Sequence, residues 1–408
     1  SHIFCTHSSC SCKQFLGRSP TKFARAGCQD WIHLLQAYLP FKMVSRCHSN
    51  PFTVFDAEAE LRREKRSAVW FYFHPSMEPV ARAVSERCAK NEILSDTGEP
   101  ICNSPQFDWQ APFRPRKRVE LKSTIKWDKF HDGFPNLFIT DVKQMAGKDV
   151  ILVCSFHSPE AIFEQLSVIY AMPRYLARSF TVILPYFPTG TMERVDTEGQ
   201  IATAKTLATM LSSIPLTARG PAQIVIFDIH ALQERFYFSE SVIPRLESAI
   251  PLLLRELGQF PSDCKIAIAF PDEGAYKRFH LAFEGKPCII CFKIRDGKNR
   301  IVRVKEGDPR GCHVVIVDDL VQTGGTIIEC AKALYVQGAE AVSAYVTHPV
   351  FPKESWKKFV NSEVKFENFW ITDTIPHARE ICEHEPFKLL SIADIIADIL
   401  FGYDLLQL

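Results

Sequence analysis

Short runs of apolar residues alternate along this chain with longer stretches whose apolar positions recur at helical spacing. Runs such as 69–73, 150–155 and 314–317 are rich in β-branched and aromatic residues and are too short for helices. Nearly every position in them is apolar, which is typical of strands buried on both faces of a parallel sheet. The same pattern predicts further strands at 181–185, 224–227, 265–270, 288–294, 341–347 and 369–371.

Helical spacing fills the intervals between these strands. The helices it predicts lie near 77–89, 160–172, 200–213, 244–257 and 326–337. Strands separated by helices imply βαβ units, so we expect an α/β protein with two tandem, doubly wound parallel-sheet domains. The expected divisions are an N-terminal extension over 1–66, a first domain over 67–243 with an insertion near 95–118, and a second domain over 244–408.

The composition of the chain limits the kinds of partner that it can bind. A chain of 408 residues with 46% hydrophobic and 23% charged residues is an ordinary globular protein. Its net charge of +1 gives no general affinity for nucleic acid, and no apolar run is long enough to span a membrane. Its 14 cysteines are scattered through apolar segments, which indicates a reducing interior. We therefore expect neither nucleic acid nor a membrane as a partner.

The first 50 residues differ from the rest. Asp30 is their one acidic residue, among several Lys and Arg and many Ser and Cys. Such acid-poor, basic composition is typical of a transit segment, and we expect a plastid address, with cytoplasm or mitochondrion as alternatives. The stretch from Trp31 to Tyr38 could instead form an amphipathic helix that docks on the body or on a partner.

The most informative segment follows the apolar run 314–317. Two adjacent carboxylates, Asp318 and Asp319, precede a turn that predicts a phosphate site and consists of Gln322, Thr323, Gly324, Gly325 and Thr326. Glycines let backbone N–H groups converge on an anion, and the following helix adds its positive N-terminus. The segment lacks the Lys of a nucleoside-triphosphate P-loop and the GxGxxG of a dinucleotide site. Paired carboxylates beside a phosphate cradle favour a sugar phosphate.

Other predicted strands also end in polar residues. Asp228 and His230 follow the strand at 224–227, and Asp272 follows the strand at 265–270. Ligands of open α/β sheets bind beyond the carboxyl ends of strands, so these ends predict a crevice for a cation and phosphates. On residue type alone, His230 is more readily a structural histidine than a ligand of Mg²⁺.

Long motifs give the chain a resemblance. The turn after Asp319 resembles the phosphoribosyl-diphosphate loop of type I phosphoribosyltransferases and of ribose-phosphate diphosphokinases, or PRPP synthetases. The segment 228–238 (DIHALQERFYF) resembles one that the diphosphokinases have and the transferases lack. The similarity begins near residue 68 and is strongest to the plant-type second class, through 130–138, 162–170, 184–190 and 301–307.

This resemblance implies domains of the phosphoribosyltransferase type and a reaction. ATP, as co-substrate with Mg²⁺, would give its diphosphoryl group to ribose 5-phosphate, making 5-phospho-α-D-ribose 1-diphosphate for nucleotide, His and Trp synthesis. The enzyme would be a homo-oligomer. The implied site residues are Lys293 and Arg295 on a mobile catalytic loop, Phe130 and Asp132 at the adenine, Asp228, His230 and Asp272 at the metal, and 318–319 with 322–326 at the sugar phosphate.

Two positions depart from the main class. Thr191 stands where that class has a nucleotide-contacting Arg, and Gln322 replaces an Asp. Both agree with the plant-type class, which resembles an enzyme of looser nucleotide selectivity. The alternative is an inactive regulatory or structural homologue within a larger complex, although retention of the implied catalytic residues argues against it.

Overall fold

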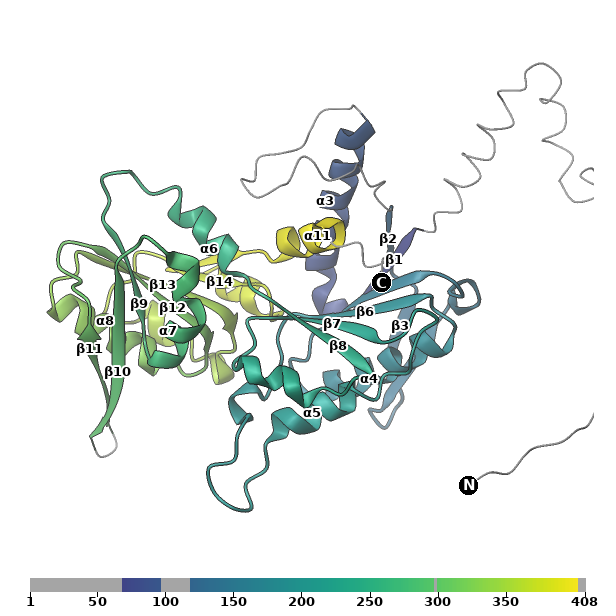
Figure 1. Cartoon of the computed structure of the whole chain (residues 1–408). Helices are drawn as coiled ribbons and strands as arrows, with labels where there is room; N and C mark the ends of the chain where they lie inside the picture. Colours follow the sequence, from purple (N-terminus) through teal and green to yellow (C-terminus); the bar gives the residue numbers. More distant parts are fainter. Residues whose placement is uncertain (1–67, 97–117, 297–298, 403–408) are drawn as a thin grey trace, which may run out of the picture. The chain divides into compact units, whose positions relative to one another are not determined.

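The structure, a computed structural model, describes residues 68–96, 118–296 and 299–402 (Figure 1). The chain divides into two units, Ser1–Arg66 and Ser67–Leu408. The first unit, and most of the insertion expected near 95–118, lie outside the described residues. Both sheets belong to the second unit. None of the described helices is long and apolar enough to cross a membrane.

The first sheet has the strand order β2-β1-β5-β6-β7-β8, and all its neighbouring strands are parallel. These strands are β1 (Val69–Phe73), β2 (Val119–Lys122), β5 (Asp149–Val153), β6 (Ser179–Leu184), β7 (Ala222–Phe227) and β8 (Val242–Glu247). The helices that follow three of them are α3 (Glu78–Asp96), α4 (Pro159–Arg174) and α5 (Thr203–Leu211). A separate antiparallel hairpin joins β3 (Ile125–Lys129) to β4 (Pro135–Ile139).

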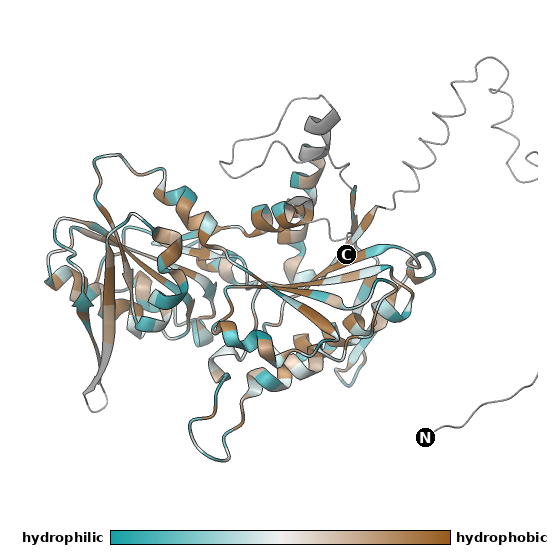
Figure 2. Ribbon diagram, viewed as in Figure 1, coloured by the Kyte–Doolittle hydropathy of each residue, from teal (hydrophilic) through white to brown (hydrophobic). Residues whose placement is uncertain are grey.

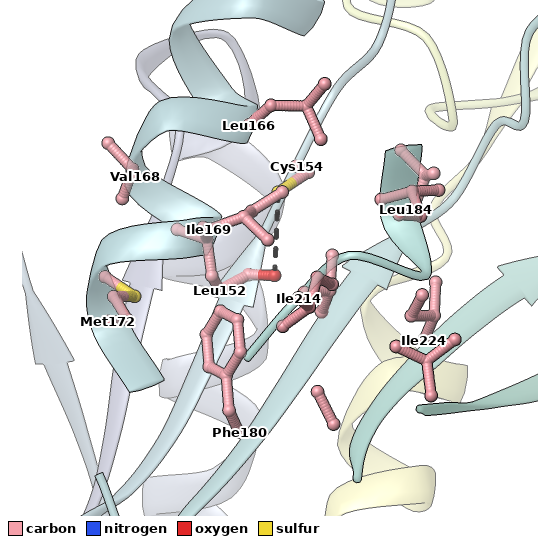
Figure 3. Close-up of a cluster of buried hydrophobic side chains, with 14 of the residues drawn as sticks. Leu152, Cys154, Leu166, Val168, Ile169, Met172, Phe180, Leu184, Ile214 and Ile224 are labelled. Atoms are coloured by element: carbon pink, nitrogen blue, oxygen red, sulfur yellow. Dashed lines mark hydrogen bonds between the residues drawn. The ribbon is translucent and has the colours of Figure 1, made fainter. Parts of the chain in front are cut away.

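Strand alternation explains the apolar runs of this sheet. Trp70 and Tyr72 pack into one core, and Phe71 and Phe73 pack into another on the opposite face. In the first core, strand residues such as Leu152 and Phe180 meet α4 side chains such as Ile169 (Figure 3). Figure 2 colours each residue by hydropathy. The strands are largely apolar, and the helices beside them carry both hydrophobic and hydrophilic residues. The expectation of strands buried on both faces is therefore correct.

The second sheet has the order β11-β10-β9-β12-β13-β14-β15, parallel except for the β10–β11 pair. Its strands are β9 (Ile266–Phe270), β10 (Cys288–Asp296), β11 (Asn299–Glu306), β12 (His313–Val321), β13 (Ala341–Pro349), β14 (Phe369–Thr372) and β15 (Phe387–Leu390). Its helices are α6 (Ile250–Leu257), α7 (Glu273–Phe279), α8 (Gly325–Val336), α9 (Lys357–Val360) and α10 (Ala378–Ile381). The last helix, α11 (Ala393–Gly402), packs with α3 in a core of the first sheet.

One expected element is wrong. The helix predicted near 244–257 is two elements, strand β8 over Val242–Glu247 and helix α6 over Ile250–Leu257. Pro251 would lie in the interior of the predicted helix, where Pro is not tolerated, whereas in the structure it stands in the first turn of α6. Pro244 lies in β8, and an edge strand such as β8 accepts a Pro. The first sheet thus extends past residue 243, the expected end of the first domain.

Candidate active site

The predicted phosphate turn joins β12 to α8. Gly324 has φ +79° and is the N-terminal cap of α8, which begins at Gly325. The carbonyl of Gln322 accepts a hydrogen bond from Ser355 Oγ at 2.7 Å, and that of Thr323 accepts one from Lys358 Nζ at 3.1 Å. These bonds engage the carbonyl oxygens of the turn and leave the N–H groups of the helix N-terminus for an anion.

The two glycines of the turn differ in their surroundings. A Cβ on Gly324 would lie 2.4 Å from Cε2 of Phe359, whereas a Cβ on Gly325 would meet nothing within 4 Å. Gly324 therefore fits against the body of the domain. The open side of Gly325 is where the positive helix end can receive a phosphate.

The adjacent carboxylates at the end of β12 face different surroundings. Asp318 is half-buried, and its Oδ1 accepts a hydrogen bond from the backbone N–H of Asp319 at 3.0 Å. Asp319 is 4% exposed, and its Oδ2 lies 2.7 Å from both His230 Nδ1 and Arg278 Nη1. The resemblance assigned both carboxylates to the sugar, but in the structure the carboxylate of Asp319 already contacts His230 and Arg278.

Electrostatics reinforce this contact. Burial alone would raise the pKa of Asp319, but the hydrogen bond with His230 and the charge of Arg278 outweigh it and hold the pKa well below its usual range. The same hydrogen bond raises the pKa of His230, against the opposing effect of its burial. Since an ionised carboxylate can only accept, Nδ1 of His230 carries the proton, and in the neutral ring Nε2 keeps its lone pair.

Asp228 has a structural environment that its position after β7 did not predict. Its Oδ1 accepts a hydrogen bond from Ser248 Oγ at 2.6 Å, and its Oδ2 accepts from Ala249 N at 2.9 Å and Thr347 Oγ1 at 2.7 Å. Its φ of +36° is rare for a residue with a side chain. The carboxylate expected at the metal thus joins the end of β7 to β13 and to the residues before α6.

Asp272 caps the N-terminus of α7, with Oδ1 accepting from Ala275 N at 3.0 Å. Helix α7 also carries Arg278, whose guanidinium reaches Asp319. The sequence did not single out Arg278, because an Arg near the end of a helix has no distinguishing pattern.

Glu234 is a second residue that the sequence analysis missed. It is 1% exposed, its Oε1 accepts from the N–H of Ala231 at 2.9 Å, and its Oε2 has no hydrogen-bond partner among the described residues. Burial raises the pKa of Glu234 to about 7, although the Ala231 bond opposes this. A Cβ on Gly190 would lie 3.2 Å from His230 Cβ and 3.5 Å from Glu234 Oε1, so the loop after β6 packs closely here.

The remaining expected residues lie on two hairpins. Lys293 and Arg295 are on β10, opposite Val302 and Arg300 of β11, and their side chains lie outside the described part. Phe130 and Asp132 lie in the β3–β4 turn, where Phe130 is 56% exposed and Asp132 Oδ1 accepts from Phe134 N at 3.1 Å. The basic segment is therefore an antiparallel hairpin in its backbone.

The donor atoms fit one kind of metal site. No group of three or more His, Cys, Asp or Glu side chains within 68–96, 118–296 and 299–402 is arranged to hold a metal ion. Mg²⁺ commonly keeps its waters and takes one or two protein ligands together with substrate phosphates. Of the expected ligands, His230 and Asp272 would be the two left to hold such an ion, since the carboxylate of Asp228 is engaged by three hydrogen bonds.

Comparison with known proteins decides the family. Residues 117–214 match the N-terminal domain of ribose phosphate pyrophosphokinase, and residues 289–379 match the phosphoribosyl transferase domain. Ribose-phosphate pyrophosphokinase 4 of Arabidopsis thaliana is 54% identical over 287 residues, which cover 69% of this chain and 85% of the relative. The chain belongs to the ribose-phosphate pyrophosphokinase family. The resemblance inferred from the motifs is confirmed.

Other pyrophosphokinases extend the comparison. A rice protein named ribose-phosphate pyrophosphokinase 3, chloroplastic (Oryza sativa subsp. japonica), is 55% identical, covering 69% of this chain and 70% of the relative. A spinach protein named ribose-phosphate pyrophosphokinase 3, mitochondrial (Spinacia oleracea), is 53% identical, covering 68% and 70%. The crystal structure of phosphoribosylpyrophosphate synthetase from Mycobacterium smegmatis is similar with a TM-score of 0.64 and 21% identity, covering 82% of this chain and 98% of that one. It confirms the expected fold class.

Proposed function

We propose that the chain transfers the diphosphoryl group of ATP to the C1 hydroxyl of ribose 5-phosphate. Oxygen O1 of the sugar forms a bond to the β-phosphorus while the bond from that phosphorus to the α-phosphate oxygen breaks. The products are AMP and 5-phospho-α-D-ribose 1-diphosphate, a precursor for nucleotide, His and Trp synthesis. The observation that carries this proposal is the open anion site at Gly325, at the N-terminus of α8 and beside Asp318, in a chain of the pyrophosphokinase family.

In this proposal the site residues have separate tasks. The N–H groups of the turn from Thr323 to Thr326 receive the 5-phosphate, and Asp318 accepts from a ribose hydroxyl. Lys293 and Arg295 stabilise the charge that develops on the transferred phosphates. Phe130 stacks on the adenine and Asp132 hydrogen-bonds it.

His230 and Asp272 would hold Mg²⁺, which would neutralise part of the phosphate charge when bound. Asp228 then acts at a distance from the metal, because three hydrogen bonds already occupy its carboxylate. Its task is to fix the turn that presents His230.

An assay of AMP release, with and without ribose 5-phosphate, tests the reaction. We expect AMP only when both substrates and Mg²⁺ are present, with the diphosphate on C1 identified by phosphorus NMR. AMP release at the same rate with and without ribose 5-phosphate would indicate that another molecule accepts the diphosphoryl group. A folded protein that releases no AMP would support the alternative of an inactive regulatory homologue.

The assembly and the compartment are further parts of the proposal. The exposed Phe138 of the β3–β4 hairpin supports a homo-oligomer, in which a second copy covers that side chain. Light scattering of the purified chain tests this. The acid-poor composition of residues 1–50 supports a plastid address, with mitochondrion and cytoplasm as alternatives.

A further inference from the structure

Two elements and a loop of the second unit meet at one carboxylate oxygen. Oδ2 of Asp319, on β12, lies 2.7 Å from Nδ1 of His230 after β7 and 2.7 Å from Nη1 of Arg278 on α7. The contact to His230 is a hydrogen bond, whereas the contact to Arg278 is an ion pair without hydrogen-bond alignment. The side chains of Asp319 and Arg278 are 5% and 13% exposed, so this arrangement is largely shielded from water.

Strand geometry separates Asp319 from its neighbour. Strand β12 continues through both aspartates to Val321, with Asp318 paired to Val346 and Leu320 to His348 of β13. Successive side chains of a strand point to opposite faces, so Asp318 and Asp319 cannot both face one sugar while the strand stays regular.

The histidine contact has a chemical consequence. A carboxylate that accepts from Nδ1 fixes the ring orientation and the tautomer, and it keeps the lone pair on Nε2 for a ligand. A buried carboxylate is costly unless it is paired, and Arg278 supplies the second positive partner. The side chain of His230 remains 35% exposed, so its other edge is accessible.

From these contacts we infer that Asp319, held by Arg278, is a positioning residue that aims Nε2 of His230 at the metal–triphosphate and does not bind the ribose hydroxyls. This inference rests on the proposed function. It divides the aspartate pair, with Asp318 serving the sugar phosphate and Asp319 serving the nucleotide side of the reaction.

Equilibrium binding separates the two aspartates. The probes are Mn²⁺ with a non-hydrolysable ATP analogue, followed by electron paramagnetic resonance, and ribose 5-phosphate, followed by calorimetry. Asp319→Asn can donate to Nδ1 and favour the wrong tautomer, so we expect the Mn²⁺ affinity of the nucleotide complex to fall about 10- to 100-fold. The affinity for ribose 5-phosphate should stay within about twofold of wild type, because the sugar contacts remain.

Asp318→Asn is the matched control. It should lower the affinity for ribose 5-phosphate and leave the Mn²⁺ affinity of the nucleotide complex nearly unchanged. A second variant, Arg278→Met, leaves the carboxylate in place and should also weaken Mn²⁺ binding, with Arg278→Lys restoring most of it. If Asp319→Asn does not fold, the Arg278 pair carries the test.

Several results would overturn the inference. Loss of sugar-phosphate affinity in Asp319→Asn with unchanged Mn²⁺ binding would make Asp319 a sugar ligand. Unchanged Mn²⁺ binding in the folded Asp319→Asn and Arg278→Met variants would make the ion pair merely structural. Because both readouts are equilibrium affinities, a wild-type protein that binds both probes without turnover would contradict only the proposed function.

Discussion

At the scale of single residues, Gly324 and Gly325 are neighbours with different physical constraints. Gly324→Ala would combine a φ of +79° with a Cβ 2.4 Å from the Phe359 ring, so we expect it to lose about 2 kcal/mol or more of unfolding free energy. Gly325→Val meets no atom of the protein within 4 Å of its Cβ and should stay folded, but its side chain would fill the anion position. Urea unfolding and calorimetry with ribose 5-phosphate measure the two effects. Unchanged sugar-phosphate affinity in a folded Gly325→Val would contradict the assigned phosphate site.

Lys293 should act on the transition state more than on the bound substrates. Lys293→Ala should lower kcat by about two to four orders of magnitude, which corresponds to roughly 3–5 kcal/mol of lost transition-state stabilisation, and should leave KM nearly unchanged. Lys305→Ala is a matched control on the same hairpin, since Lys305 makes an exposed ion pair with Glu273 at 2.8 Å. Steady-state kinetics of both variants give the comparison. Turnover of Lys293→Ala within tenfold of wild type would make this Lys structural.

The sequence pointed to candidate site residues that follow strands and missed those that only folding brings there. Asp318, Gly325 and His230 stand after apolar runs, where a parallel sheet places its ligands. Arg278 lies 41 positions before Asp319 in the numbering, on a helix, and only the packing of α7 beside β12 brings it within 2.7 Å. The sequence also could not show that Asp319 faces His230, because strand alternation assigns opposite faces without saying what lies on each.

At the scale of elements, buried strands were predictable and edge elements were not. The central strands read as continuous apolar runs, because both faces of each sheet are covered. Strand β8 was mistaken for part of a helix, because at a sheet edge its residues are mostly half-exposed and lack that run. The β3–β4 hairpin was missed as an element for the same reason, since exposed residues such as Phe138 alternate with packed ones such as Leu137.

The 3₁₀ turn after β1 depends on a neutral histidine. His74 caps it, with Nδ1 accepting from Ser76 N at 3.4 Å, and Nε2 donates to Glu164 Oε1 at 2.8 Å. Burial lowers the pKa of His74 below its ordinary value of 6.5, despite the opposing effect of Glu164. The unfolded chain then binds more protons between the lowered pKa and 6.5, so unfolding free energy should rise with pH through that window and fall again on acidification.

A comparison with His74→Asn isolates this effect. Asn keeps a capping acceptor but does not titrate. Urea unfolding from about pH 5 to pH 8 should show a flatter stability profile for the variant than for wild type, since ordinary His titrates within this range. Parallel profiles for the two proteins would mean that protonation of His74 is not linked to folding.

At the scale of the whole molecule, the number of alternating strands and helices predicted two parallel sheets. It did not predict the contacts between residues that are far apart in the sequence. Thr347 Oγ1 donates to Asp228 across 119 positions of sequence, and His348 Nε2 contacts the carbonyl of Phe227 across 121. Arg87 pairs with Asp394 across 307 positions, where α11 meets α3. No local pattern marks such contacts, because each partner is an ordinary residue of its own element.

The boundary between the two units gives the last prediction. Strand β1 begins at Val69 and pairs with both β2 and β5. All the strands of the first sheet therefore lie after residue 66. A protein that starts at Ser67 should therefore keep its activity, with a thermal midpoint within about 2 °C of the full chain. A protein that starts at Ser76 is the control, because it lacks the buried Trp70, Phe71 and Tyr72 and should not fold. Residues 1–66 fused to a fluorescent reporter should carry it into plastids. If the Ser67 protein melted several degrees lower, or eluted as a smaller species on size-exclusion chromatography, residues 1–66 would stabilise the fold or the assembly and the targeting hypothesis would lose its basis.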